Sequence, residues 1–569
     1  MKFRRIGSYL LSALLLTGIL PPVAQADSSH PQLTSTGNNG DGGYEMNVAL
    51  GKPYTVSEPA NDPYPDTGGE LTDGVLASDD PADEAWTGFY KGSSRVITID
   101  LGSDQSVSSI RANFLQIPSA KIQYPNAVSI YTSKNGKDWT ALKHAGPPVA
   151  FWIGVNPPQY TFEWDAVKDG VPGGGDKSSS AVFSRYVKVR FTTKDWVLLD
   201  EIQVMGQDGH IKGATVPNEK ELYLQPGAQT GGISNLALLY NGHYNKGLGD
   251  WTTEKLIPYL AHVDQNGTPS DWLFDGILYL GLGSPAGRSF AMSFNGSNWD
   301  DWKWYLDKTF ATDGDLDALN VAVGEVMKEL GKPGGKSTDK YPVVLMVPYP
   351  AEPQTNFGDV DGDGITENFN AAQVGADASL ASKKKAVDWY IDQLIQRWDA
   401  KGYNNLNLAG LYWLNEEVAP DGTNDAQLIK HASNIVHDND LLFYWIPHLR
   451  GYQFFTWKEL GFDAVAYQPN YFFQADSPLD RVRDAADWAK SLGMGMEMEF
   501  DERILTDANF RQKYYDYLNG AIQLGYAKDT FRAYYQGNDT LLQAARSDEP
   551  AVRATYDDMY RLIKGKYRP

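Results

Sequence analysis

The chain has 569 residues, with 50 lysines and arginines against 72 aspartates and glutamates, so its formal net charge is 50 − 72 = −22. This length predicts two to four domains, because domains usually have ~100–200 residues. So acidic a chain is unsuited to sequence-independent binding of a phosphate backbone, and we expect no nucleic-acid partner. The sequence contains no cysteine, which excludes a disulfide framework, a thiolate metal site and a cysteine nucleophile.

Residues 1–26 have the pattern of a secretory signal peptide. A positively charged start is followed by an apolar stretch over 10–20 and by a small-residue cleavage site that ends at Ala26. The apolar stretch is shorter than the ~20 residues that span a bilayer, so we expect export rather than stable membrane insertion. The protein is then secreted, and the polar segment 27–43 is predicted to be a disordered leader.

Residues 44–206 are predicted to form a β-sandwich. Apolar and polar residues alternate in short runs such as 96–102, 127–132 and 186–191, which is typical of half-buried strands. An Asn-Gly pair at 135–136 predicts a hairpin turn. We find no convincing helical pattern between these strands, and a sandwich of short antiparallel strands is the default for such a series.

Several blocks of this unit match one family in order. They are 47–52, 71–74, 97–102, 129–133, 185–191 and 200–204, with Trp86 and Trp139 between them. Together they resemble the discoidin or coagulation-factor type C domain, whose bacterial members are mostly carbohydrate-binding modules. The resemblance implies a sugar-binding module here.

The same resemblance implies two kinds of site in this unit. In that family a structural calcium lies near an early acidic turn and a late glutamate, which correspond to Asp73 and Glu201. Trp86, Tyr90 and Trp152 are the aromatic side chains that we expect to stack on sugar rings. The alternative for Asp73 and Glu201 is that they are ordinary surface carboxylates, and the alternative for the aromatic residues is packing in the core. For the fold as a whole the alternative is membrane binding, which the acidic net charge disfavours.

A linker that is interrupted by glycines and prolines, 207–232, separates this unit from residues 233–569, whose sequence pattern is different. There apolar runs of strand length alternate with helical patterns, which is typical of a parallel sheet with helical crossovers. The candidate strands are 236–241, 276–282, 343–348, 408–414, 441–446, 464–468, 493–500 and 531–535. Helical patterns between them include 316–330, 381–400, 479–491 and 510–524.

Eight strand–helix units predict a (β/α)8 TIM barrel with its active site at the carboxyl ends of the strands. A doubly wound open sheet is the alternative. It is less favoured because the count is eight and no G-x-G-x-x-G loop follows an early strand.

Acidic residues stand at the ends of the fourth and seventh candidate strands. Glu416 and Glu417 follow the fourth, and alternation along the seventh puts Glu497 and Glu499 on the face opposite its methionines. Carboxylates inside a barrel are costly to bury unless they are paired or functional. Two carboxylates across a pocket are what glycoside hydrolysis requires. A structural ion-pair network at the barrel rim is the alternative.

This placement, with Asn415 directly before Glu416, resembles the clan of retaining barrel glycosidases often called clan A. The resemblance implies that Glu416 is the acid/base, that Asn415 holds the sugar hydroxyl next to the reacting carbon, and that Glu499 is the nucleophile. Glu417 stands where that clan often has proline, and the eighth strand lacks the usual tryptophan. Glu417 and Glu497 therefore remain alternative catalytic residues.

Other polar and aromatic residues near the predicted strand ends are candidates for substrate binding, because polar groups between flat aromatic faces suit sugars. They are Asn241, His243, Tyr244, Tyr349, Trp413, Asn415, His448, Tyr467, Asn470, Tyr471 and Tyr535. Each of them also fits ordinary barrel packing.

A separate acidic motif predicts a structural calcium site. Asp359, Asp361 and Asp363 occupy positions 1, 3 and 5 of a D-x-D-x-D-G loop, and Ile365 stands at position 7, which supplies a backbone carbonyl in such loops. Asn370 stands at position 12, where an EF-hand has glutamate, so we expect a calcium-binding surface loop rather than a full EF-hand. A solvated acidic turn is the alternative, and we expect no organic cofactor.

These features favour a secreted, retaining glycoside hydrolase that acts on an extracellular polysaccharide and carries a sugar-binding module. Residues 233–569 as a whole also resemble an uncharacterised domain of secreted bacterial proteins, often found beside such modules. The first alternative is a non-catalytic secreted or cell-surface glycan-binding protein. A metal-dependent hydrolase or deacetylase is less favoured, because the 8 histidines form neither H-x-x-E-H nor H-E-x-x-H. The negative charge weakly favours neutral or amino-sugar polymers.

Overall fold

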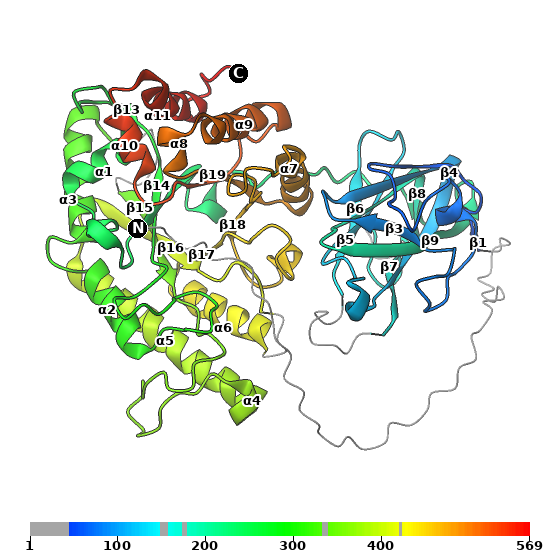
Figure 1. Cartoon of the computed structure of the whole chain (residues 1–569), viewed down its shortest axis with the longest axis horizontal. Coiled ribbons are helices and arrows are strands. Elements are labelled where there is room, and N and C mark those ends of the chain that lie inside the picture. Colours follow the sequence, from blue (N-terminus) through cyan, green and yellow to red (C-terminus); the bar gives the residue numbers. More distant parts are fainter. Residues whose placement is uncertain (1–44, 148–156, 173–178, 333–339, 420–423) are drawn as a thin grey trace. The chain divides into compact units, whose positions relative to one another are not determined.

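The computed structural model describes residues 45–147, 157–172, 179–332, 340–419 and 424–569 (Figure 1). The predicted signal peptide and leader lie outside these residues, as does Trp152. No helix within the described ranges is both long and apolar enough to cross a membrane.

The first described domain is an antiparallel β-sandwich, as the sequence predicts. Its strands are β1 (Met46–Asn47), β2 (Tyr54–Val56), β3 (Thr87–Tyr90), β4 (Arg95–Leu115), β5 (Val128–Ser133), β6 (Thr140–Ala145), β7 (Gln159–Asp165), β8 (Ala181–Phe191), β9 (Trp196–Asp208) and β10 (Ala214–Thr215). The long β4 pairs with β2 and mainly with β8 along its first half, and with β7 and β9 along its second. One strand thereby serves both layers of the sandwich.

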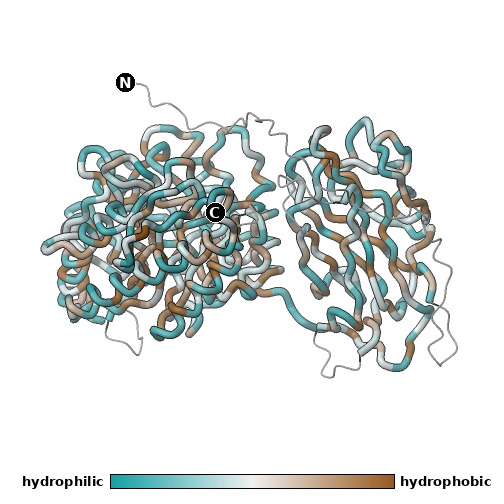
Figure 2. The backbone as a smooth tube through the Cα atoms, turned by 90° about the horizontal axis from the view of Figure 1, so that it is seen from below, coloured by the Kyte–Doolittle hydropathy of each residue, from teal (hydrophilic) through white to brown (hydrophobic). Residues whose placement is uncertain are grey.

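Hydropathy alternates along these strands (Figure 2). Ile97, Ile99 and Leu101 of β4 are fully buried, while the residues between them reach the surface in part. Successive side chains of a strand point to opposite faces, so this alternation lets each layer bury one face against the other.

The second domain is a closed barrel of eight parallel strands. They are β11 (Asn235–Tyr240), β14 (Gly276–Leu280), β15 (Tyr341–Val347), β16 (Leu406–Trp413), β17 (Leu442–Trp445), β18 (Ala464–Tyr467), β19 (Gly495–Glu499) and β20 (Arg532–Tyr535). The first and last strands pair through Asn235 and Arg532, which excludes the open-sheet alternative. The prediction of a (β/α)8 barrel is confirmed.

Helices surround the barrel strands (Figure 1). They are α1 (Thr253–Leu260), α2 (Trp299–Thr309), α3 (Asp315–Leu330), α4 (Ala371–Val374), α5 (Ala376–Lys401), α6 (Asp425–Asp438), α7 (Asp480–Leu492), α8 (Arg503–Thr506), α9 (Ala508–Leu524), α10 (Thr540–Ala545) and α11 (Pro550–Ile563). A hairpin of β12 (Ala261–Val263) and β13 (Pro269–Trp272) follows α1. The described connection from β17 to β18 has a short 3-10 turn, Phe454–Thr456, in place of a long helix.

Strand β15 shows why the barrel strands are continuously apolar in sequence. Its residues from Val343 to Val347 are all buried, because alternate side chains fill the barrel interior while the others pack under the helices. A polar residue within such a strand therefore stands out, and the carboxyl ends of β16 and β19 carry several.

Candidate active site

A cavity of about 270 Å³ lies at the carboxyl ends of the barrel strands. Its lining includes the glutamates Glu416, Glu497 and Glu499, the tyrosines Tyr240, Tyr412 and Tyr535, and the polar residues His448, Gln468 and Asn470. These side chains come from several different strands and the loops that follow them. Side chains that converge from separate strand ends are the usual construction of a barrel active site.

Strand β19 supplies two of the three carboxyl groups. Glu497 and Glu499 both line the cavity, whereas Met496 and Met498 between them are buried on the other face of the strand. This is the alternation that the sequence predicts. The two carboxyls are themselves almost fully buried.

The protein holds one oxygen of the Glu499 carboxyl and leaves the other without a partner. Oε2 accepts hydrogen bonds from the hydroxyl of Tyr517 on α9 and from the backbone N–H of Tyr471, the latter at 3.3 Å. Oε1 is buried and has no hydrogen-bond partner among the described residues. A buried acceptor without a partner is costly, which is common at ligand sites.

Burial and mutual repulsion raise the pKa values of the two β19 glutamates. Desolvation is the main cause for Glu499, whose pKa rises to about 8 although its hydrogen bonds with Tyr517 and Tyr471 act in the opposite direction. The pKa of Glu497 rises well above its usual value through desolvation and then through the charges of Glu499 and Glu416. Like charges in one desolvated space cannot all ionise readily, so this cavity retains protons.

Glu416 follows β16 and faces the same cavity from the other side. Its side chain is solvent-exposed, yet the protein that encloses the cavity raises its pKa to about 7 through desolvation, against a hydrogen bond with Gln468. Water that reaches the carboxyl offsets part of this desolvation. Glu416 and Glu499 thus share one cavity with both pKa values raised, so the pair retains a proton that a general acid could donate.

Three other predicted residues join the glutamates in the cavity, namely His448, Asn470 and Tyr535. Nδ2 of Asn470 donates to Nε2 of His448 at 2.5 Å, and Nδ1 of His448 donates to the carbonyl of Leu449 at 2.9 Å. Burial lowers the pKa of His448, so the imidazole is neutral with its proton on Nδ1.

Several predicted substrate-binding residues pack within the protein instead. Asn241 bonds with Thr309, Asp315 and Tyr305, and the Tyr349 hydroxyl donates to Asp425. Trp413 is fully buried and absent from the cavity lining, because strand alternation turns its neighbour Tyr412 inward. These positions correct the substrate-binding expectation for Asn241, Tyr349 and Trp413.

Tyr467, Tyr471, His243 and Tyr244 also lie outside the lining of the cavity. The hydroxyl of buried Tyr467 accepts from the backbone N–H of Arg450, and that of Tyr244 accepts from the N–H of Leu282. Tyr471 serves through its backbone N–H, while its hydroxyl donates to Asp516. His243 is exposed and contacts Trp304 edge-on.

Asn415 and Glu417, which flank Glu416, have partners in the loops. The buried Asn415 side chain accepts from the backbone N–H of Met292 at 3.4 Å and donates to the carbonyl of Glu417 at 2.7 Å. The Glu417 carboxylate accepts from the N–H of Tyr452 and does not line the cavity. Of the two glutamates that follow β16, Glu416 is the one that shares the cavity with Glu499.

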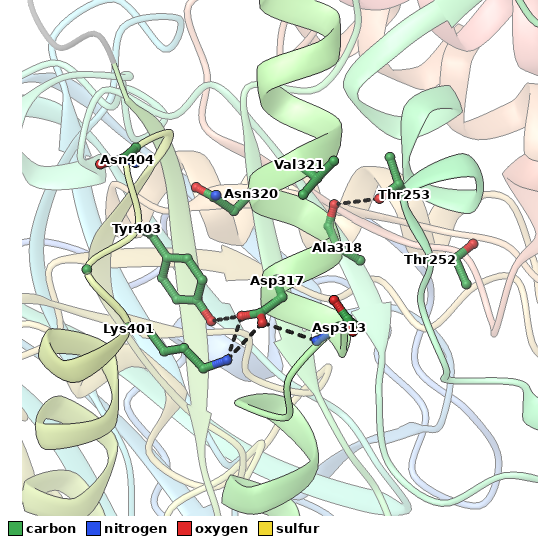
Figure 3. Close-up of a pocket in the computed structure, with 11 residues that line it drawn as sticks. Thr252, Thr253, Asp313, Asp317, Ala318, Asn320, Val321, Lys401, Tyr403 and Asn404 are labelled. Carbon is green, nitrogen blue, oxygen red and sulfur yellow. Dashed lines mark hydrogen bonds and ion pairs between the residues drawn. The ribbon is translucent and has the colours of Figure 1, made fainter.

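A larger cavity of about 440 Å³ lies elsewhere on the barrel, among the start of α1, helix α3 and the end of α5 (Figure 3). Its carboxylate Asp317 is bound by Nζ of Lys401 at 2.7 Å and by the Tyr403 hydroxyl at 2.9 Å (Figure 3). A carboxylate neutralised in this way is structural, so the smaller cavity at the strand ends is the better candidate for chemistry.

The predicted calcium loop gathers its aspartates as expected. Carboxylate oxygens of Asp359, Asp361 and Asp363 lie within 4.8 Å of one another, so the cluster could hold a metal ion. Sequence patterns did not point to Lys385, whose Nζ lies 2.7 Å from the Asp361 carboxylate and 3.1 Å from that of buried Glu367. Ile365 follows the cluster with an exposed side chain.

In the sandwich, the buried Glu201 carboxyl has an oxygen, Oε2, without a partner in the described structure. Its Oε1 accepts from Asn47 at 3.4 Å. Desolvation and then the nearby charges of Asp73 and Asp200 raise its pKa to about 7, while a backbone hydrogen bond from Gly74 acts against them. Two carboxyls close together with an unpartnered oxygen fit a hard cation such as calcium.

The sandwich aromatics divide into core and surface. Trp86 is 1% exposed and its indole N–H donates to the Ser78 carbonyl, so it is a core residue and not a sugar platform. Tyr90 is 40% exposed and packs against Trp196, which Tyr64 contacts edge-on at 5.3 Å. Tyr64 also lines a cavity of about 620 Å³ with several prolines.

The fold and the cavity define a two-domain protein, a β-sandwich followed by a (β/α)8 barrel with a carboxyl-lined pocket at its strand ends. Residues 235–561, more than half of the chain, match the family model described as a domain of unknown function, DUF4855. The chain belongs to that family.

Solved carbohydrate-binding modules are similar to part of the chain. Chitosan-binding module 1 of a chitosanase/glucanase from Paenibacillus sp. IK-5 has 17% identity over 28% of this chain and 99% of its own, with a TM-score of 0.19. CpGH89CBM32-6 from Clostridium perfringens has 20% identity over 28% and 99%, with a TM-score of 0.19. A fucose binding module from Streptococcus pneumoniae has 15% identity over 30% and 100%, with a TM-score of 0.21. At these values the similarities say nothing of what this chain binds. A comparison with curated proteins found no match.

Proposed function

We propose that the protein is a secreted glycoside hydrolase that cleaves an extracellular polysaccharide with retention of configuration. The observation that carries the proposal is the unpartnered Oε1 of Glu499 in the cavity that Glu416 shares. Glycoside hydrolysis needs two carboxyls that face one sugar, one of them holding a proton. The pKa values of both Glu416 and Glu499 are raised, so the pair retains a proton, which the proposal assigns to Glu416.

The reaction has two steps in this proposal. Glu416 protonates the leaving glycosidic oxygen while Oε1 of Glu499 attacks the anomeric carbon, which breaks the glycosidic bond and forms a glycosyl ester. Glu416 then takes a proton from water, whose oxygen attacks the same carbon and releases Glu499. Tyr517 and the Tyr471 N–H hold Oε2, so negative charge on the carboxylate is stabilised away from the reacting oxygen.

The sandwich serves as a sugar-binding module in this proposal. Exposed Tyr90, backed by Trp196 and Tyr64, offers aromatic surface for the apolar face of a sugar ring. Asp73 and Glu201 would hold a structural calcium there, and the Asp359 loop a second one in the barrel. Export of the chain follows from the signal-peptide pattern of its first 26 residues.

The test is release of reducing ends from a panel of plant, fungal and bacterial polysaccharides by residues 27–569. Glu499→Gln and Glu416→Gln keep the shape of each side chain and remove its acid–base chemistry. Glu417→Gln is the matched control, because it removes a carboxyl of the same loop that does not line the cavity.

We expect release by the wild type and by Glu417→Gln, and a loss of several orders of magnitude in the other two variants. Release that survives in Glu499→Gln would contradict the assignment of the nucleophile. Binding of the same polymers without release by the wild type would contradict hydrolysis and identify a glycan-binding protein.

A further inference from the structure

The strand-end cavity holds one carboxyl more than glycoside hydrolysis uses. Glu416 and Glu499 account for the acid/base and the nucleophile, and Glu497 lies on the same face of β19 with an exposed fraction of only 3%. Strand alternation alone does not require an acid there, since branched apolar residues such as valine, isoleucine and leucine dominate the interior of such barrels. This third carboxyl is buried without a structural counter-ion and so destabilises the free protein, and a functional role has to offset that cost.

No positively charged side chain is found among the described residues that line this cavity. The groups that face Glu497 are Glu499 on its own strand, Glu416 after β16, Tyr412 on β16 and Tyr535 on β20. All of them are acidic or neutral. His448 is neutral as well, because burial lowers its pKa.

One cationic group acts on the site from outside the cavity. Arg481 of α7 interacts with Glu499 electrostatically, but its Nη1 donates to the carbonyl of Asn470 and the residue does not line the pocket. No cationic side chain lines the space in which the three carboxyls meet, so negative charge that forms on them is left for a ligand to balance.

We propose that the cavity recognises a sugar that carries a free ammonium group, and that Glu497 is the partner of that ammonium. The proposal rests on the proposed function for the identity of the site and adds the substrate class: a polymer that contains unacetylated amino sugar. The buried, unpartnered Oε1 of Glu499, on which the proposed function also rests, points to a ligand in the same space.

An ammonium group fits this cavity better than the alternatives. It donates up to three hydrogen bonds, and its charge strengthens each of them in a desolvated site. An N-acetyl group has no positive charge, and a uronic acid would add a fourth negative group. A neutral sugar leaves the carboxyls without a counter-charge, so Glu497 has to keep its proton.

Charge balance gives this proposal a distinctive signature. In the free protein Glu497 is protonated, because burial and the neighbouring carboxyls raise its pKa. When a cationic sugar binds, the Glu497 carboxyl loses its proton to solvent and becomes the carboxylate partner of the ammonium. Binding therefore releases about one proton for each cationic sugar held at this position.

The test is calorimetric titration of residues 27–569 carrying Glu416→Gln, which blocks turnover and keeps both β19 glutamates. The probes are oligomers of glucosamine and of galactosamine, their N-acetylated forms and neutral glucose oligomers of the same length. Titration in two buffers of different ionisation enthalpy counts the protons released. Glu497→Gln is added to this background, with Glu417→Gln as the control of equal charge, and thermal melting confirms that each variant folds.

We expect the amino oligomers to bind about ten- to hundredfold more tightly than the N-acetylated ones, the range of a hydrogen bond to a charged group. Glu497→Gln should remove this preference and the proton release, whereas Glu417→Gln should keep both. Equal or tighter binding of the acetylated or neutral oligomers would overturn the proposal, as would a preference that survives Glu497→Gln or no binding of any amino oligomer.

Hydrolysis of the same oligomers by the wild type separates this proposal from the proposed function. Cleavage of acetylated or neutral oligomers without an amino preference would keep the hydrolase and overturn the ammonium site. Glu497-dependent binding of amino oligomers without any cleavage would keep the ammonium site and overturn the hydrolase.

Discussion

The hydroxyl of Tyr517 donates a hydrogen bond to Oε2 of Glu499, and this contact fixes which oxygen of that carboxyl stays free. Tyr517 lies on α9, so a helix on the outside of the barrel orients a group on the inside. The hydrogen bond lowers the pKa of Glu499 against the larger effect of burial. Tyr517 is thus a positioning residue for the proposed nucleophile.

Tyr517→Phe should therefore lower kcat about ten- to hundredfold, the effect expected for a hydrogen bond to a charged group. Without the hydroxyl, the pKa of Glu499 rises, so the acidic limb of the pH–rate profile should move to higher pH. The measurement is kcat/KM against pH for both proteins on the same substrate. A variant that melts earlier but keeps the wild-type pH limbs would show a merely structural tyrosine.

Wild-type activity should have a bell-shaped pH profile centred near neutral pH. At low pH all the carboxyls are protonated and no nucleophile exists; at high pH Glu416 has lost the proton that it must donate. The pKa values of Glu416 and Glu499 are raised to about 7 and about 8, and the limbs belong to the coupled set rather than to one residue. An optimum near pH 4 to 5, where unperturbed carboxyls titrate, would contradict this electrostatic picture.

The sandwich should lose stability as the pH rises, and calcium should restore it. Burial raises the pKa values of Asp200 and Glu201 to about 6 and about 7, so the folded domain holds protons that the unfolded chain has already lost. Its free energy of unfolding should fall as the pH rises from about 4 through about 7. A calcium ion at Asp73 and Glu201 binds the deprotonated carboxyls, so its stabilisation should be greatest at pH 7 and above.

Scanning calorimetry of the full mature chain with and without calcium measures both effects. Glu201→Gln should weaken the pH dependence and remove this calcium effect, while Glu84→Gln on the surface of the same domain should change neither. A sandwich transition that does not respond to calcium at pH 8 would argue against the site.

Lys385 should compete with calcium at the Asp359 loop. Its Nζ lies beside Asp361 and Glu367, where it supplies positive charge to the cluster. Lys385→Gln removes that charge, so its calcium dissociation constant should be lower than that of the wild type in a calorimetric titration. Lys384→Gln gives the same charge change at the neighbouring position and serves as the control. Equal affinity in both variants would show that the lysine does not occupy the calcium position.

The sequence was sufficient to predict the architecture, because the patterns that indicate strands and helices are local in the chain. Strand-length apolar runs that alternate with helical patterns predicted eight barrel strands, and alternation in 493–500 placed Glu497 and Glu499 together on one face. The direction in which a side chain faces was harder to predict where two adjacent strand residues are both aromatic. Tyr412 and Trp413 are equally plausible in a strand, and only the closed barrel shows that Tyr412 faces the cavity while Trp413 packs against Tyr349 and Phe443 outside it.

Contacts between distant elements were beyond the reach of sequence patterns. Tyr517 reads as one more apolar position of an amphipathic helix, and its bond with Glu499 depends on how α9 packs on the barrel. Asn415 is a second example of a contact that could not be predicted from the sequence. The resemblance implied a sugar contact, yet the loop after β14 reaches its side chain first, through the N–H of Met292.

The strict alternation of β19 restricts how this protein can evolve. Met496 and Met498 pack outward while Glu497 and Glu499 face inward, so inserting or deleting one residue before Glu497 would exchange the two sets. Thioethers would then fill the pocket and carboxyls would be forced under the helices, which should abolish both activity and folding. Related sequences should therefore diverge in this strand by substitution alone, and length changes should collect in the loops around it.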